Sequence, residues 1–383
     1  MTSGLASGTS EENTAGKRLV LDALSGRSTE RIPATVMTWG FDYLWEVVGL
    51  EPWQLALGSS EMYHRAHMAM YERHRPDIIW YSGGGYGPED PVLLSEDSEN
   101  WTVRNPNSGR DYLVNKTGLG LTALQPREEK IEAARGIHSR EDADRVVPEF
   151  TGWGETYLNG LRRLITELGD RALVLPNYCT SYIATCYTLG FERSMEMMLT
   201  DPDLFLYICE RHRAGEELRM RELAEAGCEA VLIADAWASC DIISPEMFRR
   251  FALPYQASFA EACRKAGLKC ILWNEGDVIP ILDLEAQLDY DAFAFEQPRK
   301  TFAVTVKKVR QVFGADRCLM GNLDSEELLA RNDPSSIRAA VWQQIQDSGP
   351  GAPFIVSTGS PLPSGTPPEA VDTALTAARE FRW

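Results

Sequence analysis

Residues 227–235 read GCEAVLIAD, and this short segment is the clearest example of a pattern that predicts the fold class. Gly227 ends a long helical segment, an apolar run follows it, and Asp235 comes directly after the run. A continuous Val/Leu/Ile run, without regular alternation of polar residues, is typical of a parallel strand that is buried on both faces. The stretch therefore predicts a helix end, a buried strand, and an acid at the carboxyl end of that strand.

Similar apolar runs recur along the chain, and helical segments separate them. The clearest helices are predicted over residues 59–74, 201–226 and 245–266, the last of which begins after Ser244 and stops at Gly267. Eight strand–helix units in succession predict an α/β fold of the (β/α)8 (TIM) barrel type. The predicted strands are 32–38, 77–82, 172–177, 229–234, 268–273, 291–295, 318–322 and 353–357.

Two segments do not follow this alternation of strands and helices. Residues 91–126, after the second strand, contain the turn sequence Asn105-Pro106-Asn107-Ser108-Gly109 between apolar stretches, which predicts an inserted β-hairpin. Residues 1–16 are rich in Gly, Ser, Thr and Glu and lack the basic start and apolar core of a signal peptide, so we expect a disordered leader. The domain prediction is this leader followed by a single barrel domain over residues 17–383.

The composition restricts the class of partner. Against 56 Asp and Glu the chain has 38 Lys and Arg, which gives a formal net charge of −18. Phosphate binding needs clustered basic residues, so we expect no nucleic-acid partner. No apolar run approaches the ~18 residues of a membrane span, so we expect no membrane partner and a cytoplasmic protein that acts on a small molecule. A homodimer is expected only because dimers are common among oligomeric enzymes.

Polar and aromatic residues follow the predicted strands, at the end of the barrel where this fold carries its chemistry. Asp235 and Glu275 are the candidate catalytic residues, as general acids or bases or as partners of a substrate cation. Gly276 permits a tight turn that aims Glu275 into the barrel mouth. The alternatives are that Asp235 braces a loop by accepting backbone N–H groups and that Glu275 is a solvated loop acid.

The candidate substrate-binding residues come from all eight strand ends. Aromatic rings beside carboxylates suit an ammonium group through cation–π attraction, although these rings could instead pack beneath the loops. The set is Trp39, Tyr81, Asn177, Tyr178, Trp237, Ser239, Trp273, Asn274, Glu296, Asn322 and Ser360. His64, His67 and His74 share one helix but have no acid or cysteine partner nearby in the sequence, so we expect a solvated outer helix rather than a metal site.

Several motifs together resemble the uroporphyrinogen decarboxylase superfamily over roughly residues 28–382. They are GCEAVLIAD at 227–235, ASCDIISPEMFRRFALPY at 238–255, LMGNL at 319–323 and STGSPLPSGTPPEA at 357–370. The superfamily includes the decarboxylases and the zinc- and corrinoid-linked methyltransferases. The resemblance implies a single barrel with its site at the strand ends.

The departures from the family motifs concern the site. The decarboxylases carry an arginine-containing loop after the first strand, where this chain reads Trp39-Gly40-Phe41-Asp42-Tyr43. The methyltransferases hold zinc with a His-x-Cys pair after the fifth strand and a Cys after the eighth, where this chain has Trp273, Glu275 and Ser360. The resemblance thus implies a divergent member without a Cys/His zinc site. A hard cation held by Glu275, Asp277 and Asp235 is the remaining metal hypothesis.

Three functions stay open from the sequence. The first is methyl (one-carbon) transfer or demethylation of a small neutral or cationic substrate, with no tightly bound cofactor and with a corrinoid, on a partner protein, as the methyl acceptor. The second is a cofactor-independent decarboxylase or lyase that acts on a small acid. The third is a non-catalytic binding protein on the same barrel.

Overall fold

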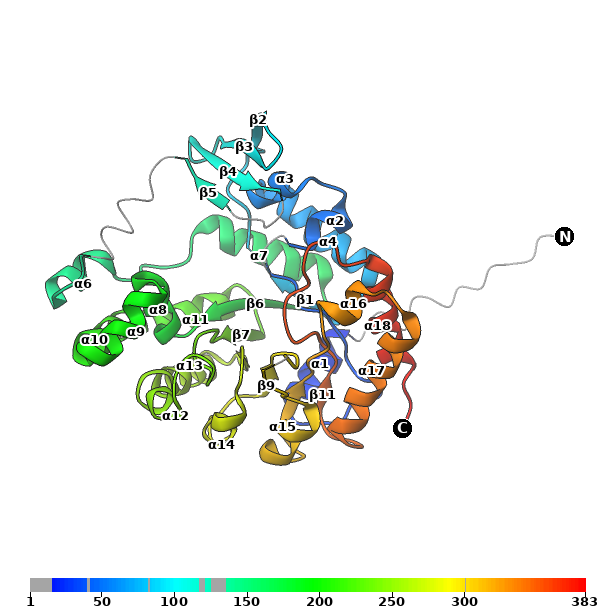
Figure 1. Cartoon of the computed structure of the whole chain (residues 1–383). Helices are drawn as coiled ribbons and strands as arrows, with labels where there is room; N and C mark the ends of the chain where they lie inside the picture. The colour runs from blue at the N-terminus through cyan, green and yellow to red at the C-terminus, as the bar shows by residue number, and fades with distance from the viewer. Residues whose placement is uncertain (1–15, 40–41, 82, 117–120, 125–135, 300) are drawn as a thin grey trace.

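The computed structural model describes residues 16–39, 42–81, 83–116, 121–124, 136–299 and 301–383. Except for Gly16, where helix α1 (Gly16–Leu24) begins, the predicted leader lies outside the described residues. The main sheet contains seven parallel strands, which follow one another around the barrel in chain order (Figure 1). They are β1 (Ile78–Tyr81), β6 (Leu173–Cys179), β7 (Ala230–Ala234), β8 (Lys269–Asn274), β9 (Ala292–Phe295), β10 (Cys318–Met320) and β11 (Phe354–Ile355). The predicted α/β barrel is therefore confirmed.

The predicted first strand, residues 32–38, closes the barrel without forming a regular strand. Ala34 makes a single parallel bridge to Val356, beside β11. On the other side, the Asp77 N–H donates to the Ala34 carbonyl at 2.9 Å, just before β1. Pro33 has no N–H to give to a ladder, and the Met37 N–H donates to the hydroxyl of Thr358 instead. Side-chain bonds thus replace part of the strand pairing here.

An ion pair anchors the start of this closing segment. Arg31 donates to both carboxylate oxygens of Asp77, at 2.7 and 2.6 Å, and Asp77 also accepts the Ala34 N–H at 2.8 Å. Paired guanidinium and carboxylate groups of this geometry are among the stronger polar contacts in proteins. Arg31, directly before the first predicted strand, therefore has a structural role.

Alternation along the strands separates an inner from an outer layer. Alternate strand residues form one buried cluster with side chains of α1, which packs at the amino-terminal ends of the strands. The cluster includes Val20, Leu24, Ile78, Trp80, Leu173, Leu175, Ala230, Leu232, Ile271, Trp273, Ala292, Ala294, Cys318 and Met320. The intervening residues, such as Val231 and Ile233, pack against the surrounding helices. This alternation decides which residues at the strand ends face the barrel mouth.

Helices surround the sheet (Figure 1). The longer ones are α4 (Ser60–His74), α7 (Glu155–Leu168), α8 (Ser181–Leu189), α9 (Phe191–Thr200), α10 (Pro202–Arg213), α11 (Glu216–Glu225), α13 (Leu253–Ala266), α15 (Val306–Phe313), α17 (Pro334–Ser348) and α18 (Pro368–Glu380). The shorter ones are α2 (Leu44–Val48), α3 (Pro52–Ala56), α6 (Arg140–Val146), α12 (Pro245–Met247), α14 (Leu282–Glu285) and α16 (Glu327–Ala330). A 3-10 turn covers Ile279–Ile281.

Two predicted long helices are interrupted. The segment 201–226 forms α10 and α11, which are separated at Ala214 and Gly215. The segment 245–266 forms α12, a π-helical turn over Phe248–Ala252, and α13. Pro254 cannot donate to the carbonyl four residues earlier, which gives a physical reason for the wider turn in front of it.

The insertion after β1 is larger than the predicted hairpin. It is a four-stranded antiparallel sheet of β2 (Val92–Glu96), β3 (Asn100–Asn105), β4 (Arg110–Asn115) and β5 (Leu121–Ala123), at the top of Figure 1. The predicted turn joins β3 to β4, and Gly109 adopts a φ of 66° there. Trp101, Val103 and Val114 pack against the end of α3.

The expectation of solvated histidines on α4 is wrong. All three are buried because α7 and α18 pack against α4. His64 lies 2.7 Å from a carboxylate oxygen of Glu167 on α7, and His74 lies 2.6 Å from Asp372 on α18. His64 and His74 therefore connect α4 to its neighbouring helices.

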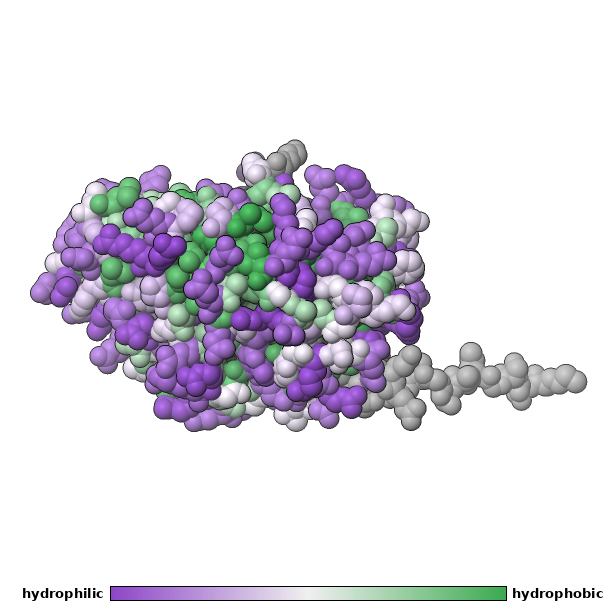
Figure 2. Space-filling model, turned by 90° about the horizontal axis from the view of Figure 1, so that it is seen from below, coloured by the Kyte–Doolittle hydropathy of each residue, from purple (hydrophilic) through white to green (hydrophobic). Residues whose placement is uncertain are grey.

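The face of the molecule shown in Figure 2 is largely hydrophilic, in keeping with the acidic composition, and has a group of hydrophobic side chains near its centre. Within the described residues, none of the helices combines the length and the apolar character needed to cross a membrane.

Candidate active site at the strand ends

The strand alternation divides the predicted site residues into two groups. Trp273 belongs to the interior cluster, Trp39 packs against it, and Asn177, Glu275 and Glu296 continue the inward-facing positions of β6, β8 and β9. By the same alternation, Tyr81, Tyr178, Asp235 and Asn274 face the helices. The barrel mouth thus has two tryptophans and two carboxylates.

Trp39 and Trp273 lie at the top of the barrel interior. Their ring centroids are 4.8 Å apart and the rings meet edge to face at 80°. The Trp273 indole N–H donates to the carbonyl of Gly359 at 3.0 Å, which fixes this ring against the loop after β11. The indole N–H of Trp39 is buried and has no hydrogen-bond partner within the described structure. The part of the chain that the structure describes therefore leaves one buried donor at the mouth without an acceptor.

Glu275 stands in a turn that only glycine allows. Gly276 has a φ of 88°, and a Cβ atom there would lie 2.3 Å from the Ser239 hydroxyl. The Gly276 N–H donates to Oε2 of Glu296 at 2.8 Å, which holds the far side of the turn. Burial and the neighbouring Glu296 carboxylate raise the pKa of Glu275 to about 7, although Arg299 opposes this shift. A half-buried carboxyl group is thereby poised to exchange a proton near neutral pH.

The arginine near the mouth is already neutralised. Arg299 donates to Oε1 of Glu296 at 2.5 Å and to Oε2 of Glu326 at 2.7 Å. The Ser360 hydroxyl also donates to Oε1 of Glu296, at 3.3 Å. Two carboxylates therefore occupy this guanidinium, which leaves it little charge to offer to an acidic substrate.

The positions that match the family's zinc ligands do come together. Trp273 is bonded to Gly359, next to Ser360, and Ser360 is bonded to Glu296, whose charge acts on Glu275. However, an indole N–H and a hydroxyl do not form the N/S donor set that zinc prefers. The hypothesis of a hard cation on Glu275, Asp277 and Asp235 is also not supported, since no three His, Cys, Asp or Glu side chains of the described chain converge in a metal-binding group.

Asp235 lies behind the mouth, not on its rim. It is fully buried, and it accepts hydrogen bonds at 2.7 Å from the Thr180 hydroxyl and from the side-chain amide of Gln256 on α13. Burial raises the pKa of Asp235 to about 7, and the two hydrogen bonds oppose this shift only in part. The geometry connects Asp235 to the helix layer.

The sequence interpretation missed two further buried acids. Glu285 of α14 accepts a hydrogen bond from the Asn274 side chain at 2.7 Å, and burial raises its pKa to about 8. Glu216 of α11 accepts hydrogen bonds from the hydroxyls of Ser181 and Ser258, and burial raises its pKa to about 7. Both acids lie on helices, so a search of the strand ends could not have found them.

The remaining predicted residues have structural contacts. The Tyr81 hydroxyl donates to the Tyr157 carbonyl at 2.7 Å, and Tyr178 packs against Trp153 and Phe259. Asn322 donates to the carbonyls of Glu296 and Val304 and so supports the loop after β9. The Ser239 hydroxyl is buried beside Gly276 and has no hydrogen-bond partner within the described structure.

Trp237 differs because its neighbours are exposed. The rings of Tyr187 and Phe191 each lie 5.3 Å from the Trp237 ring, and these two side chains are 59% and 46% exposed. They form an aromatic surface on α8, α9 and the loop after β7. We call Tyr187, Phe191 and Trp237 the aromatic rim.

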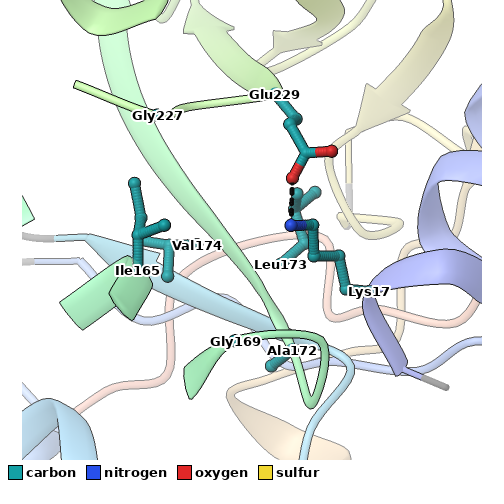
Figure 3. Close-up of a pocket in the computed structure, with 8 residues that line it drawn as sticks. All are labelled: Lys17, Ile165, Gly169, Ala172, Leu173, Val174, Gly227 and Glu229. Carbon is teal, nitrogen blue, oxygen red and sulfur yellow. Dashed lines mark ion pairs between the residues drawn. The ribbon is translucent and has the colours of Figure 1, made fainter. Parts of the chain in front are cut away.

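A small hollow lies at the opposite end of the barrel (Figure 3). Lys17 of α1 and Glu229 form an ion pair at this hollow, whose volume of about 10 Å³ has room for about one water molecule. It lies at the amino-terminal ends of β6 and β7. This end of the barrel normally serves stability.

Comparisons with known proteins agree with this architecture. Residues 110–381 match the family model described as uroporphyrinogen decarboxylase (URO-D). A uroporphyrinogen decarboxylase from Anaeromyxobacter dehalogenans is 26% identical over 285 residues, which are 71% of this chain and 79% of that protein. The chloroplastic uroporphyrinogen decarboxylase 2 of Arabidopsis thaliana is 24% identical over 307 residues, which are 78% of this chain and 71% of that protein.

Among solved structures, a methyltransferase from Methanosarcina mazei superposes with a TM-score of 0.69 at 21% sequence identity. The superposition covers 96% of this chain and 99% of that chain, so the whole barrel with its insertion has a counterpart of the same fold. The family match covers well over half of the sequence. This chain therefore belongs to the uroporphyrinogen decarboxylase family.

Proposed function

We propose that this chain is an enzyme that removes a methyl group from a small neutral or cationic substrate, with Glu275 as the proton-transferring residue. The observation that carries the proposal is a half-buried carboxyl group at the barrel mouth whose pKa is raised to about 7. Such a group is protonated in a large fraction of molecules near neutral pH and still ionises readily, which suits general acid catalysis.

The chemistry follows from what Glu275 can donate. When the bond between the methyl carbon and a nitrogen or oxygen atom breaks, its electron pair stays on that atom, and a proton from Glu275 neutralises the developing negative charge. A donor that already carries a positive charge needs no proton, and the ionised form of Glu275 would pair with it. The Trp39–Trp273 pair suits the charged donor, because the face of an indole ring attracts a cation.

Zinc activation of the donor does not fit the residues present, as shown above for Trp273, Glu275 and Ser360. A methyl acceptor must then come from outside the chain, and a corrinoid supplies a strongly nucleophilic metal centre when it is bound to a partner. The aromatic rim gives such a partner an exposed apolar surface beside the mouth. A methyltransferase with this fold is consistent with the reaction class.

The same geometry argues against a substrate with many carboxylates. Glu275 and Glu296 face the mouth, and Arg299 is bound by Glu296 and Glu326. A polyanionic substrate would meet repulsion there without a free guanidinium to offset it.

A second candidate is a cofactor-independent decarboxylase of a small acid. The indole N–H of Trp39, for which the described residues offer no acceptor, favours it, because this group could donate to a single substrate carboxylate. Protonated Glu275 would then give its proton to the carbanion left after loss of carbon dioxide. Relatives named uroporphyrinogen decarboxylase are consistent with this class.

The test is a survey of methylated amines and methoxy compounds with reduced cobalamin as the acceptor, in which the demethylated product is measured by mass spectrometry. We expect Glu275→Gln to lower the rate by roughly 10²-fold or more, as for loss of a general acid. Glu246→Gln, an exposed change of the same chemistry on α12, serves as the control and should leave the rate unchanged.

The outcomes separate the candidates. If Glu275 acts as the acid, the rate with an uncharged donor falls as the pH rises above about 7, and Glu275→Gln lacks this dependence. A Glu275→Gln variant with the wild-type rate would overturn the assignment. Release of carbon dioxide from a small acid, without methyl transfer, would favour the lyase, and ligand binding without turnover would favour a binding protein.

A further inference from the structure

A buried chain of side chains lies behind the strand end that carries Glu275. Asn274, the preceding residue, donates from Nδ2 to Oε1 of Glu285 at 2.7 Å. Gln256 donates to Asp235 at 2.7 Å, and its side chain lies close enough to Glu285 to act on the pKa of that carboxyl group. The chain therefore connects helices α13 and α14 to the carboxyl ends of β7 and β8.

Three oxygen atoms in this chain have no hydrogen-bond donor within the described structure: Asn274 Oδ1, Gln256 Oε1 and Glu285 Oε2. Their residues are at most 1% exposed, so bulk water does not reach them. A buried acceptor without a donor is strongly disfavoured. Turning either amide group does not help, because its oxygen would then face the carboxylate to which its nitrogen now donates.

A proton on Glu285 removes much of this deficit. The protonated carboxyl group is a donor as well as an acceptor, and it lies against both amides. The titratable groups that act on Glu285 or respond to it are Asp235 after β7, Cys240 in the following loop and Tyr290 before β9. None of these is a cation, and no Lys or Arg is among the groups of the described chain that shift the pKa of Glu285.

We propose that Glu285 is a neutral carboxylic acid whose reciprocal pairing with the Asn274 amide positions Glu275. Asn274 holds the turn on one side, and the Gly276 N–H bonded to Glu296 holds it on the other. Glu285 lies in the helix layer, so it is a positioning residue. Burial, which raises the pKa of Glu285 to about 8, agrees with this geometry. The positioning role rests on the proposed function of Glu275, whereas the protonation state of Glu285 does not.

The test compares Glu285→Gln with Glu285→Ala in the full chain. The Gln side chain imitates the neutral acid, because its oxygen accepts from Asn274 and its NH₂ group donates; the Ala side chain does neither. We expect the urea midpoint of Glu285→Gln to equal or exceed that of wild type at about pH 6. The difference between the two midpoints should be larger at about pH 8.5, where wild-type Glu285 must ionise. Glu285→Ala should have the lower midpoint at both pH values.

Two results would overturn the inference. If Glu285→Gln unfolds as easily as Glu285→Ala at both pH values, the native group is an ionised carboxylate. If KCl raises the wild-type midpoint above that in choline chloride at equal ionic strength, and Glu285→Gln abolishes the difference, a bound cation satisfies the oxygens instead.

The positioning role has a separate readout. In the demethylation assay, we expect Glu285→Gln to keep the wild-type dependence of the rate on pH. We expect Glu285→Ala to lower kcat and to shift the pH at which the rate falls because Glu275 ionises. Equal profiles in the two variants would refute positioning. If no substrate is turned over by any variant, the proposed function fails, while the unfolding experiments still decide the state of Glu285.

Discussion

Replacing Asp235 with Asn separates the charge of this buried side chain from its shape. Asp235 is fully buried, and its two hydrogen-bond donors, Thr180 and Gln256, are both uncharged. In Asp235→Asn, the remaining oxygen still accepts from Thr180. Once the Gln256 amide has turned, the new NH₂ group donates to Oε1 of Gln256, an atom that has no donor among the described residues of the wild type. We therefore expect the variant to fold with its local geometry preserved.

The effect on stability depends on pH. Burial raises the pKa of Asp235 from 3.8 to about 7 in the folded protein. A group whose folded pKa is raised contributes stability that is fully present below pH 3.8 and is lost as the pH rises to about 7. Each pH unit within this window costs about 1.4 kcal/mol, so wild type should lose about 2 kcal/mol from this group between about pH 5.5 and 7. The Asn variant does not ionise and should not show this loss.

The assay is urea unfolding across this pH range for wild type, Asp235→Asn and the control Asp289→Asn, which changes an exposed acid. We expect the free energy of unfolding of Asp235→Asn, relative to wild type, to rise by about 2 kcal/mol from about pH 5.5 to 7. The control should run parallel to wild type. Parallel curves for Asp235→Asn as well would refute the reasoning, because they would mean that Asp235 ionises as easily in the folded as in the unfolded chain.

Three further changes test the supports of the site. In Gly276→Ala, the positive φ of 88° and the contact of 2.3 Å with the Ser239 hydroxyl should lower the free energy of unfolding by about 2 kcal/mol or more; an unchanged urea midpoint would contradict this. Arg31→Ala removes the guanidinium that binds both carboxylate oxygens of the buried Asp77 and should cost about 3 kcal/mol, measured by calorimetry. A loss below about 1 kcal/mol would show that the Ala34 N–H and the nearby charge of Arg379 suffice to support Asp77. Trp273→Phe leaves the Gly359 carbonyl without its donor and should cost about 2 kcal/mol; near-ultraviolet circular dichroism should lose the signal of the Trp39–Trp273 pair, and an unaltered spectrum would argue against this contact.

The barrel could be predicted from the sequence, because local residue patterns define its strands. An apolar run such as residues 229–234 can be buried on both faces only inside a layered α/β fold, and seven of the eight predicted strands appear within a few residues of their predicted ends. The exception, residues 32–38, depends on partners that are distant in the chain. Pro33 and the hydroxyl of Thr358 decide its hydrogen bonding, and no local pattern reports that contact.

Which of the two candidate acids faces the mouth depends on packing between distant parts of the chain. Asp235 and Glu275 both follow buried strands, and in the sequence they are equivalent. The alternation of the strands directs Glu275 toward the interior and Asp235 toward α13, where Gln256 meets it. The packing of whole layers determines which set of alternate strand residues faces inward. The sequence neighbours of either acid therefore do not reveal its direction. The contacts of Glu285 and Gln256 with the strand ends form only in the folded chain, because α13 and α14 fold back there and bury their polar side chains.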